Sequence, residues 1–164
     1  MAPRRPKAKV AARRVRAAGA TARRGPRLAF VVARFHEGIS GAMLEAAGDE
    51  ARRQRAEVLE TIELPGCYET PLIVDALLRK GDVDAVVVLG FIERGETLHG
   101  EVMGHVVHRA LVEASLRAEK PVGLGIIGPG ATEVQAELRK DGSARAAVRA
   151  VVRSLEALSK LGAR

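Results

Sequence analysis

Residues 94–99 read RGETLH, and they combine the groups needed to hold an anion and to move a proton. They open the longest predicted helix, so the backbone N–H groups of Gly95, Glu96 and Thr97 are free to point at a phosphate. His99 falls in the first helical turn beside that anion, where an imidazole can transfer protons near neutral pH. A glycine before a helix is common, and a single histidine is often structural. The motif therefore needs support from the rest of the chain.

Polar and aromatic residues also follow two other apolar runs. Phe35, in the sequence RFHE, serves either as loose core or as a stacking surface for a planar heterocycle. Glu69, in PGCYE, either complements the dipole of the helix in whose first turn it lies or accepts hydrogen bonds from ligand hydroxyl groups. Cys67 has no neighbour that marks it as a nucleophile, so we favour a structural thiol.

Two more histidines, His105 and His108, lie three residues apart in the longest predicted helix. No carboxylate or cysteine stands at a matching interval, so we interpret them as ordinary helix residues and expect no metal site. The single cysteine also excludes an intramolecular disulfide framework and fits a reducing compartment. We therefore expect a cytoplasmic protein.

The residues with chemical potential follow strands that alternate with helices. Short apolar runs predict four strands, at 28–33, 58–62, 84–91 and 122–127. Helical spacing predicts helices at 39–55, 68–79, 97–119, 132–140 and 144–161, the last two separated by a break at 141–143 that Ser143 caps. This order predicts a three-layer α/β/α fold, a flavodoxin-like four-stranded parallel sheet with helices on both faces. Ligands of such sheets bind at the carboxyl ends of the strands, where the polar residues stand.

Length and composition limit the possible classes of protein. The chain has 164 residues, 47% of them apolar, which suits one domain with a substantial core. The longest apolar run, 85–92, is far shorter than the roughly 20 residues that cross a bilayer, so we expect no membrane span. The four aromatic residues are too few to form stacking platforms along a nucleic acid.

The net charge of +7 comes from the amino-terminal segment. Residues 1–27 carry ten basic side chains and no acidic one, whereas residues 28–164 carry 17 basic and 20 acidic side chains, a net charge of −3. We therefore predict a basic arm at 1–27 and one α/β domain at 28–164. The favoured interpretation of the arm is a solvated, mobile segment. Two alternatives are a polyanion-binding segment and an organellar transit peptide.

The run from Phe30 to Arg139, about two-thirds of the chain, resembles the lumazine synthase family. The matching segments are VARF at 32–35, LPGCYETP at 64–71, AVVVLG at 85–90, RGETLH at 94–99 and QAELR at 135–139. The combination of the second and fourth segments at this distance is specific, although each of them alone would not be.

The resemblance implies that the protein condenses 5-amino-6-(D-ribitylamino)uracil with 3,4-dihydroxy-2-butanone 4-phosphate, releasing phosphate and water, without a cofactor. His99 would be the catalytic proton-transfer residue. Gly95, Glu96 and Thr97 would hold the phosphate together with Arg139 from across a subunit boundary. The residues expected at the pyrimidine and ribityl end are Phe35, His36, Gly66, Cys67, Tyr68, Glu69, Phe91, Ile92, Glu93 and Leu124.

The resemblance also implies an oligomer, either a pentamer or a sixty-subunit shell of pentamers, with riboflavin synthase as a possible partner. The chain departs from the family pattern at His36, where asparagine is common, and at Leu124, where phenylalanine is general. Residues 128–130, GPG, replace a threonine-containing turn, and residues 17–27 have poor strand propensity for pairing with a neighbour. Two alternatives stay open: a shell or binding protein whose basic arm recruits a polyanion, and another flavodoxin-like enzyme for a different phosphorylated small molecule.

Overall fold

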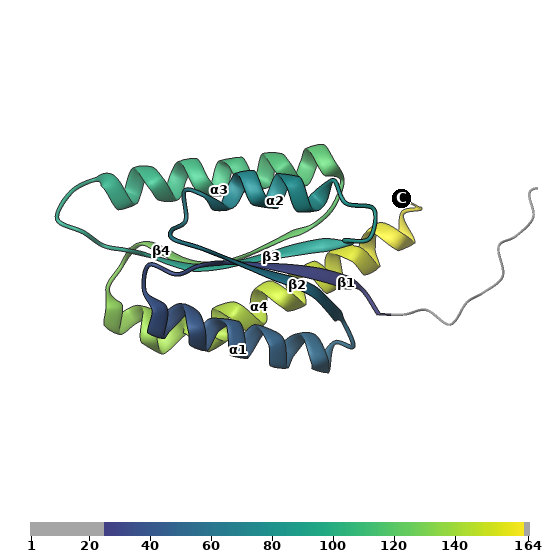
Figure 1. The fold of residues 1–164 in the computed structure, drawn as a ribbon, viewed down its shortest axis with the longest axis horizontal. Coiled ribbons are helices and arrows are strands. Elements are labelled where there is room, and N and C mark those ends of the chain that lie inside the picture. Colours follow the sequence, from purple (N-terminus) through teal and green to yellow (C-terminus); the bar gives the residue numbers. More distant parts are fainter. Residues whose placement is uncertain (1–24, 163–164) are drawn as a thin grey trace, which may run out of the picture.

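The computed structural model describes residues 25–162 as four strands that alternate with four helices (Figure 1). The elements are β1 (Arg27–Ala33), α1 (Glu37–Arg53), β2 (Glu57–Leu64), α2 (Thr70–Leu78), β3 (Ala85–Glu93), α3 (His99–Ala118), β4 (Val122–Ala131) and α4 (Glu133–Lys160). Residues 1–24 lie outside the described residues, and with them most of the predicted arm and of the segment with poor strand propensity. Arg27, which we counted in the arm, is the first residue of β1.

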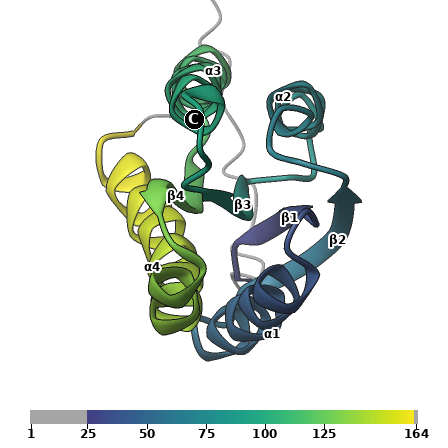
Figure 2. The same cartoon turned by 90° about the vertical axis from the view of Figure 1, so that its left-hand side faces the viewer.

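The strands form one parallel sheet in the order β2-β1-β3-β4. Helices α1 and α4 cover one face of the sheet, and α2 and α3 cover the other (Figure 2). The predicted three-layer, flavodoxin-like fold is confirmed. Because the strands are parallel, β1, β2 and β3 end at the same edge of the sheet, so the loops after them lie near one another.

The core consists of two apolar layers, one on each face of the sheet. Along β1, Phe30 and Val32 pack toward α1 and α4, whereas Val31 and Ala33 pack toward α2 and α3. Every residue of β3 from Ala85 to Ile92 is buried. A strand that is covered on both faces has no polar side, which explains why β1 and β3 read as continuous apolar runs.

The predicted break at 141–143 is wrong, because α4 is a single helix. Its buried side chains follow one helical stripe across the glycine, from Ala136 through Ala144 and Val148 to Val151. Packing of this stripe outweighs the penalty of about 1 kcal/mol that a glycine imposes inside a helix. Ser143 therefore caps nothing. The helix begins instead with a capping box, in which Thr132 Oγ1 accepts from the Gln135 N–H and Gln135 Oε1 accepts from the Thr132 N–H.

Other boundaries differ by a few residues, mostly at strand ends. β4 continues past the predicted end at Ile127, because pairing with β3 resumes at Glu93 and Ala131 after an irregularity. Gly128 makes this possible: its φ is +97°, and a Cβ there would lie 2.1 Å from the carbonyl oxygen of Ile92. The GPG segment is therefore part of β4 and not a free loop after it.

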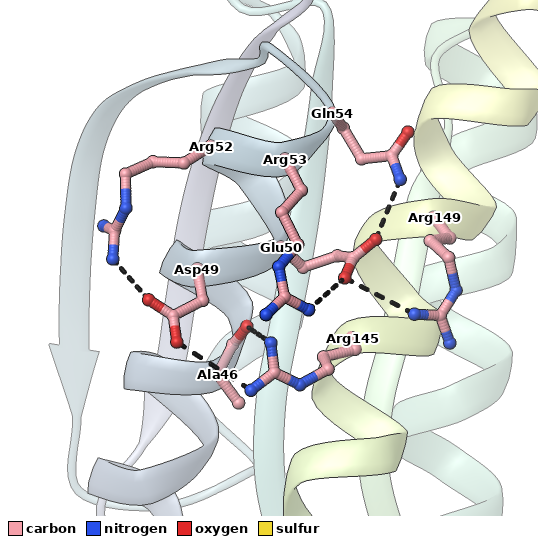
Figure 3. Close-up of polar contacts among 8 residues, drawn as sticks. All are labelled: Ala46, Asp49, Glu50, Arg52, Arg53, Gln54, Arg145 and Arg149. Atoms are coloured by element: carbon pink, nitrogen blue, oxygen red, sulfur yellow. Dashed lines mark hydrogen bonds and ion pairs between the residues drawn. The ribbon is translucent and has the colours of Figure 1, made fainter.

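A group of charged residues joins α1 to α4 (Figure 3). The Glu50 carboxylate, only 5% exposed, accepts a hydrogen bond from Gln54 and lies 3.5 Å from Arg149 and 3.9 Å from Arg53. Asp49 pairs with Arg52 on its own helix and faces Arg145 across the interface at 3.8 Å. These contacts compensate the buried charge and fix how α4 lies against α1.

Arg27 and Asp84 fasten the start of β1 to the start of β3. The Asp84 carboxylate accepts hydrogen bonds from the Arg27 backbone N–H at 2.8 Å and from its guanidinium at 2.9 and 3.2 Å. Burial alone would raise the pKa of Asp84, but these hydrogen bonds and the positive charge of Arg27 hold that pKa below its ordinary value.

We predict that Asp84→Asn reduces the free energy of unfolding by about 1 kcal/mol at neutral pH. A carboxyl group with a lowered folded-state pKa stabilises the protein above its unfolded pKa of about 4, and this stabilisation disappears as the pH falls through the folded value. The difference from the unsubstituted chain should therefore shrink between about pH 5 and pH 2. Urea titrations at fixed protein concentration measure it, with the exposed neighbour Asp82→Asn as the control. A difference that is independent of pH would contradict the assigned ion pair.

Candidate active site

A cavity of about 300 Å³ lies where β1, β2 and β3 end and α3 begins. The residues that line it are Phe35, Gly66, Cys67, Phe91, Ile92, Glu93, Gly95, Thr97, His99, Gly100 and Met103. Nine of these eleven were predicted as site residues from the sequence. Loops after three different strands thus meet in one pocket, as the parallel topology requires.

The segment from Arg94 to Leu98 forms one rim of the cavity as a loop, because α3 begins at His99 and not at the predicted Thr97. The Thr97 hydroxyl accepts the His99 backbone N–H at 3.4 Å. Within residues 25–162, the backbone N–H groups of Gly95, Glu96 and Thr97 donate no hydrogen bond. Three successive free donors at a helix start form an arrangement that suits an anion.

The His99 ring lies at this rim without a carboxylate partner among the described residues. Its one ring contact is with Tyr68, edge to face, at a centroid separation of 5.8 Å. Gly100, the next residue, packs against the end of β3, and a Cβ there would lie 2.8 Å from the carbonyl oxygen of Glu93. This close approach positions His99 beside the loop amides.

The loop after β1 contributes an aromatic group to the cavity lining. Phe35 is 74% exposed, so it is not loose core, and its role as a stacking surface stays a prediction. Its ring meets His36 edge to face at 5.0 Å, and His36 in turn lies 4.6 Å from the Phe91 ring. His36 Nε2 lies 3.2 Å from Glu93 Oε2.

The loop after β2 contributes the floor of the cavity. Cys67 is buried, and its Sγ packs against Gly90, where an added Cβ would lie only 3.1 Å away. Burial, with a smaller contribution from the nearby charge of Glu69, raises the pKa of the Cys67 thiol to about 12. The thiol therefore stays protonated at neutral pH, in agreement with the structural interpretation.

Glu69 differs slightly from its predicted place. It is the residue before α2 rather than part of the first turn, and its side chain makes no capping hydrogen bond. Its Oε2 lies close to Gly66, 3.2 Å from where a Cβ would stand. The carboxylate is thus exposed next to the cavity floor and available to a ligand.

Two predicted site residues, Leu124 and Arg139, do not line this cavity. Leu124 lies midway along the edge strand β4, paired with Val88. Arg139 is on α4 and donates to the Gln135 carbonyl oxygen at 3.1 Å. Tyr68, Glu69, His36 and Glu96 lie beside the lining residues without being among them.

Sequence reasoning missed Gly100 and Met103 as lining residues. Met103 stands one helical turn after His99, so the helical period could have indicated it. His105 pairs with Glu101 at 4.0 Å, and His108 Nδ1 contacts the Gly104 carbonyl oxygen at 2.7 Å. Residues 25–162 contain no group of three or more side chains suited to a metal ion and no helix long and apolar enough to cross a membrane.

A larger groove of about 940 Å³ runs between α1 and the edge strand β2. It contains none of the predicted site residues, and its wall includes acidic side chains such as Glu45, Asp49 and Glu63. The smaller cavity, where the free amides, His99 and Phe35 converge, is therefore the candidate active site.

Comparison with known proteins places the chain in one family. The family described as 6,7-dimethyl-8-ribityllumazine synthase matches residues 25–159. A synthase of that name from Methanococcus aeolicus is 40% identical over 135 residues, 82% of this chain and 98% of the relative. The one from Methanocaldococcus jannaschii is 42% identical over 81% of this chain and 96% of its own. The one from Aeropyrum pernix is 44% identical over 77% of this chain and 87% of the relative.

We predict that Cys67 resists thiol reagents in the folded protein. At pH 8 a thiol with a pKa near 12 is ionised about a thousandfold less than a free cysteine, and burial also hinders the reagent. Release of the coloured thiolate from an aromatic disulfide should therefore be at least about tenfold slower than in guanidinium-unfolded protein, because the stronger nucleophilicity of a high-pKa thiolate offsets only part of its lower abundance. Equal rates in the two states would show that Cys67 is accessible and ionised.

Proposed function

The chain belongs to the 6,7-dimethyl-8-ribityllumazine synthase family, a family of transferases in riboflavin biosynthesis, and from this membership we propose that the 300 Å³ cavity is its active site. The reaction joins 5-amino-6-(D-ribitylamino)uracil to 3,4-dihydroxy-2-butanone 4-phosphate. The observation that supports this site most strongly is the meeting of free loop amides, an imidazole and an exposed aromatic ring around one cavity.

The heterocyclic amine would bind at the Phe35 rim. Phe35 offers an exposed ring for stacking, and Phe91 and Ile92 form the apolar wall behind it. His36 and Glu93 lie at the edge of that wall. The ribityl hydroxyl groups would reach the free carboxylate of Glu69, past Gly66 and Cys67 of the cavity lining and the adjacent Tyr68.

The phosphorylated ketone would bind at the opposite rim. Amides of Gly95, Glu96 and Thr97 would donate to its phosphate, and His99 would exchange protons beside it. The amine attacks the ketone carbonyl carbon, and loss of water leaves a Schiff base. Elimination then expels phosphate, and a second attack followed by dehydration closes the ring. Because an amine and a ketone react without metal assistance, orientation and proton transfer supply much of the acceleration.

A cation would stabilise the leaving phosphate, and none of the residues that line the cavity is lysine or arginine. We propose that Arg139 of a neighbouring copy supplies it and that Leu124 of that copy covers the heterocycle. Val134 and Leu138, which precede Arg139 on α4, are more than two-thirds exposed, as is expected of a surface that a partner covers. Exposed apolar residues on α3, such as Val102, Val106 and Leu116, indicate a second contact surface. A pentamer, alone or within a sixty-subunit shell, would satisfy both.

The basic segment at 1–27 is proposed to bind a polyanion, since ten positive charges without an acidic residue attract phosphate-rich polymers. The protein passes its product to the next step of riboflavin biosynthesis, so riboflavin synthase is the proposed protein partner. Both proposals concern contacts outside the cavity.

We predict that the two substrates give lumazine absorbance with the unsubstituted chain and that His99→Ala lowers kcat by about a hundredfold, the loss typical of a missing acid-base group. The free energy of unfolding should stay unchanged, because His99 is exposed. His105→Ala, a 77% exposed histidine on the same helix, is the matched control. Wild-type kcat in His99→Ala would remove His99 from the mechanism, and absence of turnover in the unsubstituted chain would overturn the proposed function.

Arg139→Ala should raise the KM for the phosphorylated ketone about tenfold and leave the KM for the pyrimidine unchanged, since a charged hydrogen bond to phosphate is lost. Arg153→Ala, an exposed arginine on the same helix, should match the unsubstituted chain. The mass of the assembled particle is measured in parallel. If Arg139→Ala alters neither kinetic constant, the proposed contact between copies is incorrect.

Deletion of residues 1–24 should abolish retention on heparin at moderate salt and leave kcat and both KM values unchanged. The deletion stops before β1, so it removes no described strand residue. If the deletion also lowers activity, the segment does not bind a polyanion independently of catalysis, and the proposal is contradicted.

A further inference from the structure

His36 contacts both the ring of Phe35 and the carboxylate of Glu93, which lines the cavity. It precedes α1, and its carbonyl oxygen accepts the Ser40 N–H at 2.9 Å, so its backbone is fixed. Its imidazole lies between the Phe35 and Phe91 rings, at centroid separations of 5.0 and 4.6 Å. Phe35 has no other ring contact among the described residues. The orientation of the stacking surface therefore depends on His36.

The Nε2 atom of this imidazole lies close to the Glu93 carboxylate. Nε2 is shielded from solvent and lacks a well-aligned hydrogen bond, yet it lies 3.2 Å from Glu93 Oε2. The backbone of Glu93 is fixed as well: it pairs with Ala131, and Gly100 packs against its main-chain carbonyl oxygen. The neighbouring cation Arg34 is engaged with Glu63 at 3.4 Å. His36 is thus the side chain that holds the Glu93 carboxylate.

One side of the Glu93 carboxylate remains open to the cavity. Its side chain is 41% exposed and forms part of the cavity lining next to Phe91 and Ile92. An ionised carboxylate only accepts hydrogen bonds, so it favours a ligand edge that carries N–H groups and disfavours one that carries carbonyl oxygens. A planar ring stacked on Phe35 would present its edge to this carboxylate.

We propose that Glu93 is a specificity-determining residue for the amine-bearing heterocycle and that His36 is the positioning residue that sets its carboxylate relative to Phe35. This inference rests on the proposed function and adds to it a hydrogen-bond acceptor that selects the N–H edge of the pyrimidine. A site built to accept an N–H discriminates strongly against an analogue that lacks it, because the acceptor is then left unpaired.

Three variants test the pair. Glu93→Gln keeps the shape of the side chain but removes its charge, and His36→Phe keeps a ring between Phe35 and Phe91 but removes Nε2. The third variant combines the two substitutions. Glu113→Gln, an exposed acidic residue on α3, is the matched control.

Each single variant should raise the KM for the ribitylaminouracil about tenfold, as expected for one charge-assisted hydrogen bond, with the KM for the phosphorylated ketone unchanged. The double variant should lose no more than either single variant, because the two side chains act as one unit. Equal rises in both KM values, additive losses, or a wild-type KM in Glu93→Gln would overturn the proposal. So would a normal KM in His36→Phe together with an impaired His36→Ala, since His36 would then act by packing alone.

Equilibrium binding of the pyrimidine, measured by calorimetry, separates this inference from the proposed function and decides it should His36→Phe fail to fold. If the unsubstituted chain binds the pyrimidine without turnover and Glu93→Gln binds it about tenfold more weakly, the proposed function fails and the pair is supported. If the unsubstituted chain turns over and Glu93→Gln binds equally well, the pair alone is refuted.

Discussion

The close approach of Gly100 to the carbonyl oxygen of Glu93 is the contact on which the candidate site depends. A Cβ at this position would stand 2.8 Å from that oxygen, so a larger residue would push the start of α3 away from the end of β3. His99 and the loop amides at 95–97 would move with the helix, while Glu93 and Phe91 would stay with the sheet. Gly128 also packs against the backbone at this end of β3, because a Cβ there would lie 2.1 Å from the carbonyl oxygen of Ile92. The geometry of the cavity is thus set by backbone-to-backbone contact, which varies less than side-chain packing does.

The cavity has two chemically different rims. One presents uncharged backbone donors and an imidazole, and the other presents an aromatic ring and a carboxylate. A dianionic phosphate is favoured at the first rim and repelled by the second, whereas an N–H-bearing heterocycle has the opposite preference. The charges therefore orient two different substrates toward each other, and this arrangement suits a condensation in which the order of the two reactants across the pocket determines which atoms meet.

The sequence predicts well those features that depend on neighbouring residues along the chain. The buried strands, the helix that begins near His99 and the cavity motifs are local patterns, and the parallel topology brings them together. The single helix α4 is different, since Gly142 reads as a break and only packing of Ala144 and Val148 against the sheet and α1 shows that the helix continues. The contact of His36 with Glu93 is also beyond sequence reasoning: 57 residues separate them, and no periodicity relates the ends of β1 and β3. Resemblance to the family indicated both residues but not their pairing.

The candidate site lacks one group that the proposed contact between copies would supply. Within residues 25–162, the cavity lining supplies hydrogen-bond donors for an anion but no permanent positive charge. Amides alone bind phosphate in many proteins, but a leaving phosphate gains negative charge as its bond to carbon breaks, and a guanidinium stabilises that charge better than neutral donors do. Arg139 lies outside the cavity lining on α4, directly after the exposed apolar residue Leu138 and one helical turn and a half after the exposed Val134. If a neighbouring copy covers Val134 and Leu138, the same contact would bring Arg139 with its positive charge into the interface. Assembly and catalysis would then depend on one interface.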